Sequence, residues 1–568
     1  NMSIGAIAGS GNLSLGTGFT LTTNSSSTTA HSGVISGSGG LTKTGTGTLT
    51  LNGSSTYSGT TTLSAGTLNI NSAAAIGTGT LTITGGTIDA SKATFQSGTI
   101  GTKITGSVAV TKSTIGLLTL SNAANDYTGG TTVSNGTLAL GATNAAPGVL
   151  TISGGTFDLT TFDATPTSVT ISGGTIAGST GVLSTTAISA TPAGTATISA
   201  IIGGSTAITL NGAGALVLSG DNTFSGGTTI TTGTLRVGHD RALGSAGLTL
   251  NGGGLSNAGA SAITIANDLS LTADIGLGSA TFAGALDLTG AVDFTGTTRT
   301  LTVASGVSLS GVVSNGGLTK AGTGALTLNA ANTYAGDTTV SAGSLLQGRA
   351  NALGAVTNLL TVGTAGTVDL KGFALTVSGL ANISGAGGVV TNTGSAATLT
   401  LDGSVNKTFA GAITGAIALS KVGTFTQILT GANSFTGQLQ VNAGTIGFTQ
   451  GAHLGAGSVL VDGGTLAYAA TGTLAIPVSA SATQNISVGA TGATFNVVNR
   501  FATLNLAGTV GSTGAANLTK TGLGKVAIAG PVNLNGGVAT VSQGTLGAGF
   551  AFGGVSALNV ANGATLDL

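Results

Sequence analysis

The sequence repeats one short pattern six times, and this repetition constrains the fold more than any other feature. The first copy, GTGTLTLNGSSTYSGTTTLSAGTLNI, occupies residues 45–70 and alternates aliphatic side chains with Thr or Asn. Such alternation is typical of strands that bury one face. The Gly, Asn and Ser residues between the runs favour turns. The pattern therefore predicts strands of three to five residues that are joined by corners.

Each copy carries one large apolar residue and two glycines at fixed offsets. The large residue is Tyr57, Tyr127, Phe224, Tyr334, Phe435 or, in the weak sixth copy, Leu534. A glycine follows two residues later, at Gly59, Gly129, Gly226, Gly336, Gly437 and Gly536. A Gly-Thr-Leu-like triplet begins nine residues after the aromatic residue, or ten in the sixth copy, at Gly66, Gly136, Gly233, Gly343, Gly444 and Gly544. We predict that these are structural repeat positions, with each ring packed over the glycine two residues later.

A second pattern recurs 19 or 20 residues after the triplet glycine, around Gly86, Gly155, Gly464 and Ala564. A path that returns to the same local sequence after about 20 residues predicts stacked coils whose strands pair in parallel. We therefore predict an all-β fold, a parallel β-helix (β-solenoid) with about 20 residues per coil. A string of Ig-like sandwich domains is disfavoured, because successive triplet glycines lie 70 to 110 residues apart and a sandwich would lose strands in the shortest copy.

We predict a single continuous solenoid over residues 1–568. It has six repeat-bearing segments, at approximately 33–100, 101–200, 201–310, 311–400, 401–500 and 501–568.

Composition excludes several classes of function. The chain has 15 Lys and Arg residues, 15 acidic residues and no net charge, so it has no electrostatic footprint for nucleic acid or an anionic membrane surface. No apolar run approaches the ~18 to 20 residues of a membrane-spanning helix. Cysteine is absent, which excludes disulfides and thiolate metal sites. We expect no cofactor and no metal.

The charged residues are scattered singly, which is unlike an acid/base site. The densest cluster, His239, Asp240 and Arg241, is interpreted as a polar corner with a local contact between an aspartate and an arginine. His31 and His453 are expected at surface corners. Lysines recur about 15 residues before the aromatic position, at Lys43, Lys112, Lys320, Lys421 and Lys520. We interpret them as solvated corner charges that block lateral aggregation, with a ligand-binding stripe as the alternative.

The repeated GTGTLTLNGSSTYSGTTTLSAGTL pattern resembles the autotransporter-associated β-strand repeat, also called the passenger-associated transport repeat. All six copies fit it. The resemblance implies a right-handed parallel β-helix, secretion of a bacterial passenger through an outer membrane, and a role at the cell surface. It carries no shared catalytic residues.

These observations predict a non-enzymatic extracellular structural protein that associates with itself. The first and last coils show no capping segment, so we expect head-to-tail stacking into a surface filament or coat. The alternative is an adhesin or stalk of autotransporter type with an unknown surface or glycan ligand. A remote alternative is a β-helix enzyme that degrades polysaccharides.

Overall fold

The protein, described here from a computed structural model, consists of strands that coil around a buried apolar interior. The structure describes residues 1–70, 72, 75–79, 81–83, 87–89, 97–101, 103–105, 109–113, 115–282, 284–470, 473–476, 486–506, 510–549 and 552–568. Strand pairs of described register are parallel, as in β3 (Thr20–Thr23), β6 (Gly40–Lys43) and β8 (Thr61–Leu63). Leu21 pairs with Leu41 and Leu41 with Thr61, a rise of one coil every 20 residues. The predicted all-β parallel solenoid with about 20 residues per coil is confirmed.

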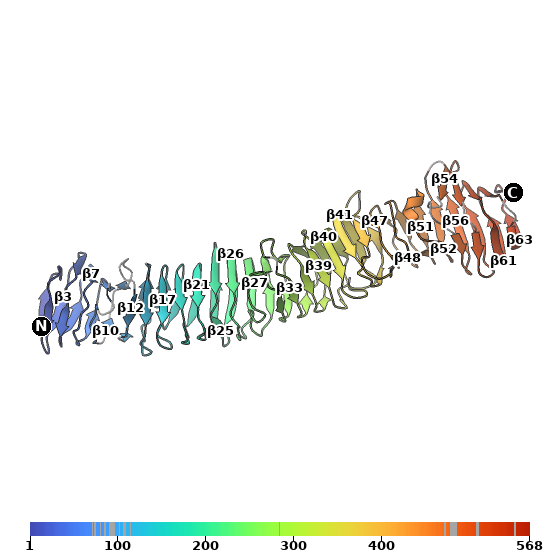
Figure 1. Ribbon diagram of the computed structural model, residues 1–568. Coiled ribbons are helices and arrows are strands. Elements are labelled where there is room, and N and C mark those ends of the chain that lie inside the picture. Colours follow the sequence, from blue (N-terminus) through green and yellow to red (C-terminus); the bar gives the residue numbers. More distant parts are fainter. Residues whose placement is uncertain are drawn as a thin grey trace. The chain divides into compact units, whose positions relative to one another are not determined.

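The chain divides into two compact units, each a stack of such coils (Figure 1). Unit 1 comprises Asn1–Ile275 and Thr281–Leu286, and unit 2 comprises Gly276–Ala280 and Asp287–Leu568. Three of the six repeat copies lie in each unit. The single continuous solenoid over 1–568 stays a prediction. Gly86 lies outside the described residues.

Alternation along each strand separates the interior from the surface. In unit 1, parallel strands include β16 (Thr131–Val133), β18 (Val149–Ile152), β20 (Ser168–Ile171) and β23 (Ala187–Ala190). Their inward residues stack as an apolar ladder: Val133, Ile152, Ile171 and Ala190, all fully buried. Their outward residues stack as a hydroxyl ladder: Thr132, Thr151, Thr170 and Ser189. Burial of the inner ladder in every coil is the main favourable term in such a fold.

Most strands have the predicted length of three to five residues, but a few run through a corner without a break. In unit 1, β26 (Ala207–Leu218) pairs with β27 (Thr228–Val237), with register shifts around Asn211. In unit 2, β40 (Thr338–Gln347) pairs with β41 (Leu359–Asp369). An irregularity in the ladder lets the strand bend there, so one long strand replaces two short ones.

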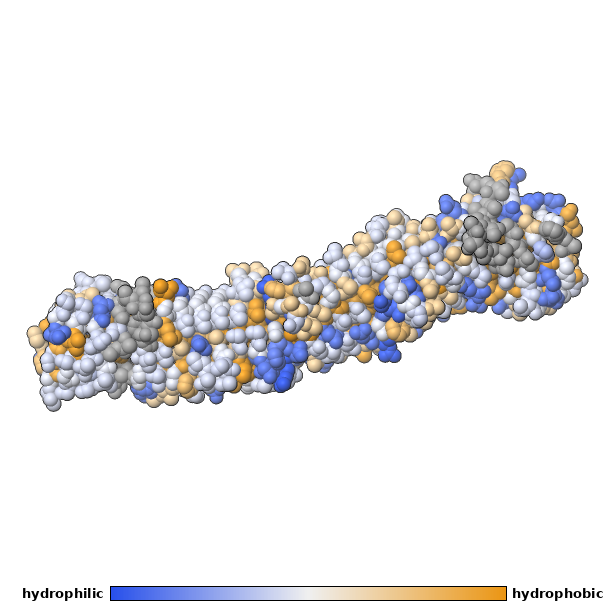
Figure 2. Space-filling view, in the orientation of Figure 1, coloured by the Kyte–Doolittle hydropathy of each residue, from blue (hydrophilic) through white to orange (hydrophobic). Residues whose placement is uncertain are grey.

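Helical structure is confined, in the described part of the chain, to one 3-10 turn, η1 (Gly451–Leu454). None of the described helices has the length and hydropathy to cross a membrane. Figure 2 shows one face of each unit, where pale residues of intermediate hydropathy cover most of the surface and strongly coloured residues are scattered.

Candidate functional site

The residues that mark the repeat occupy equivalent buried places. Tyr57, Phe224, Tyr334, Phe435 and Leu534 are 0 % exposed, and Tyr127 is 1 % exposed. Each ring lies in a turn, four residues before the next strand begins in two examples: β8 begins after Tyr57, and β40 begins after Tyr334. Each ring therefore fills the interior at a corner of its coil, where aliphatic side chains from short strands would leave space.

The glycine that accommodates the ring belongs to the next coil. A Cβ on Gly354 would lie 2.7 Å from Cε2 of Tyr334, and a Cβ on Gly455 would lie 2.5 Å from Cζ of Phe435. Gly77 and Gly244 lie in the same way against Tyr57 and Phe224. These four glycines follow their ring by 20 residues and have φ between +60° and +79°, a conformation that L side chains rarely adopt. The sequence predicted that each ring packs over the glycine two residues later. That prediction is wrong, because in these copies the glycine against the ring lies 20 residues later.

The position two residues after the ring requires glycine for a different reason, at least in four copies. A Cβ on Gly437 would lie 2.5 Å from the carbonyl oxygen of Ile417, in the main chain of the preceding coil. Glycines with such main-chain contacts are Gly59, Gly226, Gly336 and Gly437, whereas Gly129 is exposed and Gly536 meets nothing within 4 Å. In these four positions the stacked coils approach too closely for a side chain.

The glycine of each triplet forms the turn into the next strand. Its φ is positive in all six copies: Gly66, Gly136, Gly233, Gly343, Gly444 and Gly544 have φ from +62° to +77°. A left-handed conformation at this point turns the chain into the following strand, and glycine adopts it without steric cost.

A tyrosine hydroxyl and a threonine hydroxyl pair inside three of the copies. Tyr57 Oη lies 2.5 Å from Thr61 Oγ1. The corresponding distances are 2.6 Å for Tyr127 and Thr131 and 2.9 Å for Tyr334 and Thr338. Phe224 has no hydroxyl, so Oγ1 of the equivalent Thr228 is buried without a hydrogen-bond partner among the described residues. In the Phe435 copy the residue four positions later is Leu439, which needs no partner.

A buried asparagine two residues before the aromatic position bridges three successive coils. Asn332 Oδ1 accepts the N–H of Val313 at 2.8 Å, in the coil before, and its Nδ2 donates to the carbonyl of Ala352 at 2.6 Å, in the coil after. The same two bonds are made by Asn125, Asn222 and Asn433. In the first copy Ser55 accepts from Ile35 N at 3.3 Å.

Sequence analysis missed this residue, although Asn precedes the ring by two positions in four copies.

The five recurring lysines are buried, which corrects the prediction of solvated corners. Lys43, Lys112, Lys320, Lys421 and Lys520 are between 0 and 2 % exposed. Lys320 Nζ donates to the carbonyls of Ala321 at 2.9 Å and Gly322 at 2.8 Å, in its own turn, and to Ala342 at 3.0 Å, one coil later. Lys43, Lys421 and Lys520 make similar bonds across two coils. Carbonyl oxygens thus take the place of the water that would otherwise hydrate the ammonium group.

Burial shifts the proton affinities of these lysines. Removal from water lowers the pKa of Lys320, Lys421 and Lys520 to about 8. The nearby Asp402 carboxylate partly opposes this fall in the pKa of Lys421. The amine of Lys421 also lies 4.0 Å from the centroid of the Phe425 ring, a favourable cation–π distance.

Two histidines expected at the surface are also buried. His31 is 2 % exposed, and neither of its ring nitrogens has a hydrogen-bond partner in the described part of the chain. His453 is 4 % exposed and its Nδ1 accepts the N–H of Thr449 at 3.3 Å. Burial lowers the pKa of both imidazoles, so both favour the neutral form. His31 points inward because it follows the alternation of its strand, β4 (Thr29–His31), whereas His453 lies in the 3-10 turn η1, which the sequence analysis did not predict.

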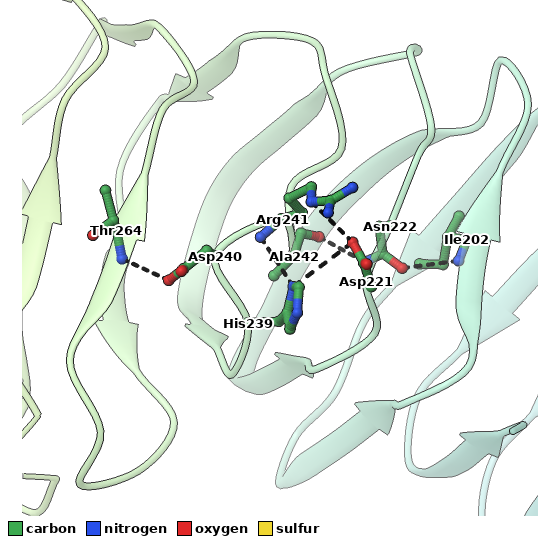
Figure 3. A network of polar contacts seen from close by, with 8 residues as sticks. All are labelled: Ile202, Asp221, Asn222, His239, Asp240, Arg241, Ala242 and Thr264. Atoms are coloured by element: carbon green, nitrogen blue, oxygen red, sulfur yellow. Dashed lines mark hydrogen bonds and ion pairs between the residues drawn. The ribbon is translucent and has the colours of Figure 1, made fainter.

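The polar cluster around His239 is held by contacts between coils (Figure 3). Asp221, one coil earlier, lies 3.3 Å from Nε of Arg241 and 3.9 Å from Nδ1 of His239. Asp240 points away from this group and accepts the N–H of Thr264 at 2.8 Å. The expected contact between an aspartate and an arginine is present, but the aspartate is Asp221 and not the adjacent Asp240.

The arrangement of this cluster is that of a surface corner. The side chains of His239, Asp221 and Arg241 are 41, 46 and 68 % exposed, so their ion pairs are screened by water. Asn222, the bridging asparagine of this copy, lies beside them between Ile202 and Ala242 (Figure 3). No group of three or more potential metal-ligating side chains occurs within the residues that the structure describes.

Fold and repeat geometry together define a class of protein: a β-solenoid built from a degenerate repeat whose buried ring, asparagine and lysine join successive coils. The passenger-associated-transport-repeat family matches five segments, residues 41–70, 110–140, 208–237, 318–346 and 419–446. The chain therefore carries passenger-associated transport repeats, and the resemblance inferred from the sequence is confirmed. The matched segments contain the copies of Tyr57, Tyr127, Phe224, Tyr334 and Phe435.

A relative of this chain is an adhesin autotransporter, BmaC, of Brucella suis biovar 1 (strain 1330). It is 33 % identical over 231 residues, which cover 36 % of this chain and 7 % of the adhesin. The matched region therefore spans less than a tenth of that relative. No solved structure matches the chain significantly.

Replacing Phe by Tyr at the two phenylalanine copies of the repeat should change stability in opposite directions, because Thr228 lacks a hydrogen-bond partner among the described residues and Leu439 needs none. Phe224→Tyr supplies a hydroxyl to Thr228 Oγ1 and should raise the free energy of unfolding by about 0.5 to 1.5 kcal/mol. Phe435→Tyr places a hydroxyl against Leu439 and should lower it by about 1 to 3 kcal/mol. Urea denaturation followed by circular dichroism measures both. A shift of the two variants in the same direction would contradict the hydroxyl pairing.

The buried lysines and tyrosines predict a maximum of stability near pH 10. Between pH 8 and about 10.5 the unfolded chain binds more protons than the native chain, because the native lysine pKa values are lowered, so stability rises with pH there. Burial raises the pKa of Tyr57 to about 12 and raises that of Tyr127 and Tyr334 further. Above about pH 10 the unfolded tyrosines lose protons that the native ones retain, so stability falls.

Thermal unfolding measured from pH 7 to 11 tests this profile. Lys320→Met should reduce the rise, whereas Lys371→Met, at an exposed lysine, should leave it intact. A melting temperature that falls steadily from pH 8 upward would contradict the assignment.

Proposed function

We propose that this chain is a non-enzymatic, extracellular segment of an autotransporter-type adhesin that takes part in attachment at a bacterial cell surface. The observation that supports this most directly is the 33 % identity, over 231 residues, with a protein named as an adhesin autotransporter. Because that match spans 7 % of the adhesin, attachment is proposed for this chain from a part of its relative. The sequence alone favours a filament, and the adhesin relative favours the attachment alternative.

The packing of the coils suits a surface exposed to proteases. Each coil hydrogen-bonds to the coils before and after it, and the asparagine and lysine bridges satisfy polar groups at the corners. Backbone in such ladders is cleaved only after local opening, and opening costs free energy because it breaks hydrogen bonds and exposes apolar side chains of the interior. The repeats can therefore hold binding surfaces on a durable support.

In the polar cluster around His239, structural partners account for both aspartates. Asp240 caps the N–H of Thr264, and Asp221 pairs with Arg241. General acid/base cleavage of a glycosidic bond uses two carboxylates that face one another across the bond. The two aspartates of this cluster point to different partners (Figure 3). This arrangement supports the non-enzymatic part of the proposal.

Self-association of the chain remains part of the proposal. Electron microscopy of the purified chain distinguishes single particles from long fibres.

Surface display tests the attachment proposal. A non-adherent laboratory bacterium that displays residues 1–568 on an outer-membrane anchor should bind epithelial cells or extracellular-matrix-coated glass in greater numbers than a matched strain that displays an unrelated β-solenoid. Purified soluble chain should compete with this binding. Equal adherence of the two strains would contradict the proposal. Release of new sugar ends from polysaccharides, abolished by Asp240→Asn, would contradict its non-enzymatic part.

A further inference from the structure

Unit 2 contains a surface pocket of about 520 Å³ where turns from several successive coils meet. Asp337, just before β40, lines one side, and the turn between β45 (Ala397–Leu401) and β46 (Lys407–Phe409) lines the other. Leu359 and Val405 contribute apolar surface, and Val405 is 62 % exposed. Sites for small ligands commonly have ~300 to 1,000 Å³ and combine apolar surface with a few polar groups.

The polar side chains of this pocket retain their capacity to bind a ligand. Within the part of the chain that the structure describes, no hydrogen bond or ion pair engages the side chains of Thr357, Ser378, Asp402, Ser404 or Lys407. Asp337 differs, since its carboxylate accepts the N–H of Leu359 at 2.9 Å. Hydroxyls in other turns commonly bond to the neighbouring coil, as Ser179 Oγ does to the carbonyl of Thr160 at 2.8 Å. Several unengaged donors and acceptors therefore face one cavity.

The coils around the pocket depart from the regular path. Leu359 pairs with Gly379 after 20 residues, but Leu375 pairs with Leu399 only after 24. The extra residues lie in loops between strands. Gln427 bonds to both the N–H and the carbonyl of Leu380 across 47 residues, which ties Leu380, within this enlarged interval, to a later coil. Departures from a regular repeat commonly occur where function requires them, because regular coils pack better.

The chemistry of the lining selects the class of ligand. The charged lining residues are two carboxylates, Asp337 and Asp402, and one ammonium, Lys407, so the lining has no excess of positive charge and favours a neutral ligand over an anionic one. Three hydroxyls add groups that can both donate and accept, which matches a ligand whose own groups do both. Leu359 and Val405 offer apolar contact for C–H faces. Sugars combine all three properties.

We infer that this pocket binds a neutral saccharide unit of a cell-surface or matrix glycan. The inference rests on the proposed attachment function and assigns it a ligand. Asp402 accepts hydrogen bonds from sugar hydroxyls and Lys407 donates to sugar oxygens, with Leu359 and Val405 below the ring. Charge-assisted bonds of this kind are the strong ones in such sites.

An array of neutral, sialylated and sulfated oligosaccharides, probed with the full chain, tests the inference. Wild-type protein should bind neutral glycans, and calorimetric titration with the best of them should give affinities about tenfold or more weaker for Asp402→Asn and Lys407→Met. Lys371→Met and Asp163→Asn, at surface positions outside the pocket, are matched controls and should bind as wild type. Circular dichroism confirms that each variant is folded.

Three results would overturn the inference: no glycan bound by the wild type, binding restricted to the anionic glycans, or equal affinity of the pocket variants and the wild type. The proposed function is judged separately by the displayed bacteria. If they adhere but the purified chain binds no glycan, the saccharide assignment fails and attachment stands. If the chain binds glycans but the bacteria do not adhere, attachment fails and the pocket stands.

Discussion

Each coil of this protein must form its main-chain hydrogen bonds with the coils before and after it. Parallel pairing forces this, because a short strand in a coil of about 20 residues has no partner within its own coil. The aliphatic ladders and the small residues at points of close approach follow from that stacking. Corners are the weak points, since the chain leaves the ladder there and its polar groups still need partners.

The buried polar residues supply those partners. Asn332 joins Val313 to Ala352, across two interfaces between coils, and Lys320 binds carbonyls of two successive coils. Both side chains lie in an interior that would penalise them if they were unpaired. A chain with few charged residues can therefore still stack its coils in one register, because a few buried polar side chains bond to specific neighbouring coils. The need to pair polar groups at corners also limits where a coil can take up extra residues. The pocket lined by Asp402 and Lys407 lies beside one such enlarged coil.

Much of this fold could be predicted from the sequence. Leu49 and Leu51 alternate with Thr, the aromatic and glycine offsets recur, and a 20-residue return indicates stacked parallel coils. The direction of single polar side chains could not be predicted in the same way. Lys320 occupies an inward-facing position in the alternation of its strand. Lysine side chains are most often exposed, however, and that general preference led to the wrong prediction of a solvated lysine. Gly354 was missed as the partner of Tyr334 because it contacts the ring across coils.

Native-state hydrogen exchange of Asn332→Ala tests most directly whether buried polar bridges hold successive coils together. The control is Asn329→Ala, whose exposed side chain bonds to Ser310. The account predicts faster exchange in Asn332→Ala both at Val313, in the preceding coil, and in the turn around Ala352, in the following coil. Exchange confined to the mutated turn, or equal in the two variants, would contradict it.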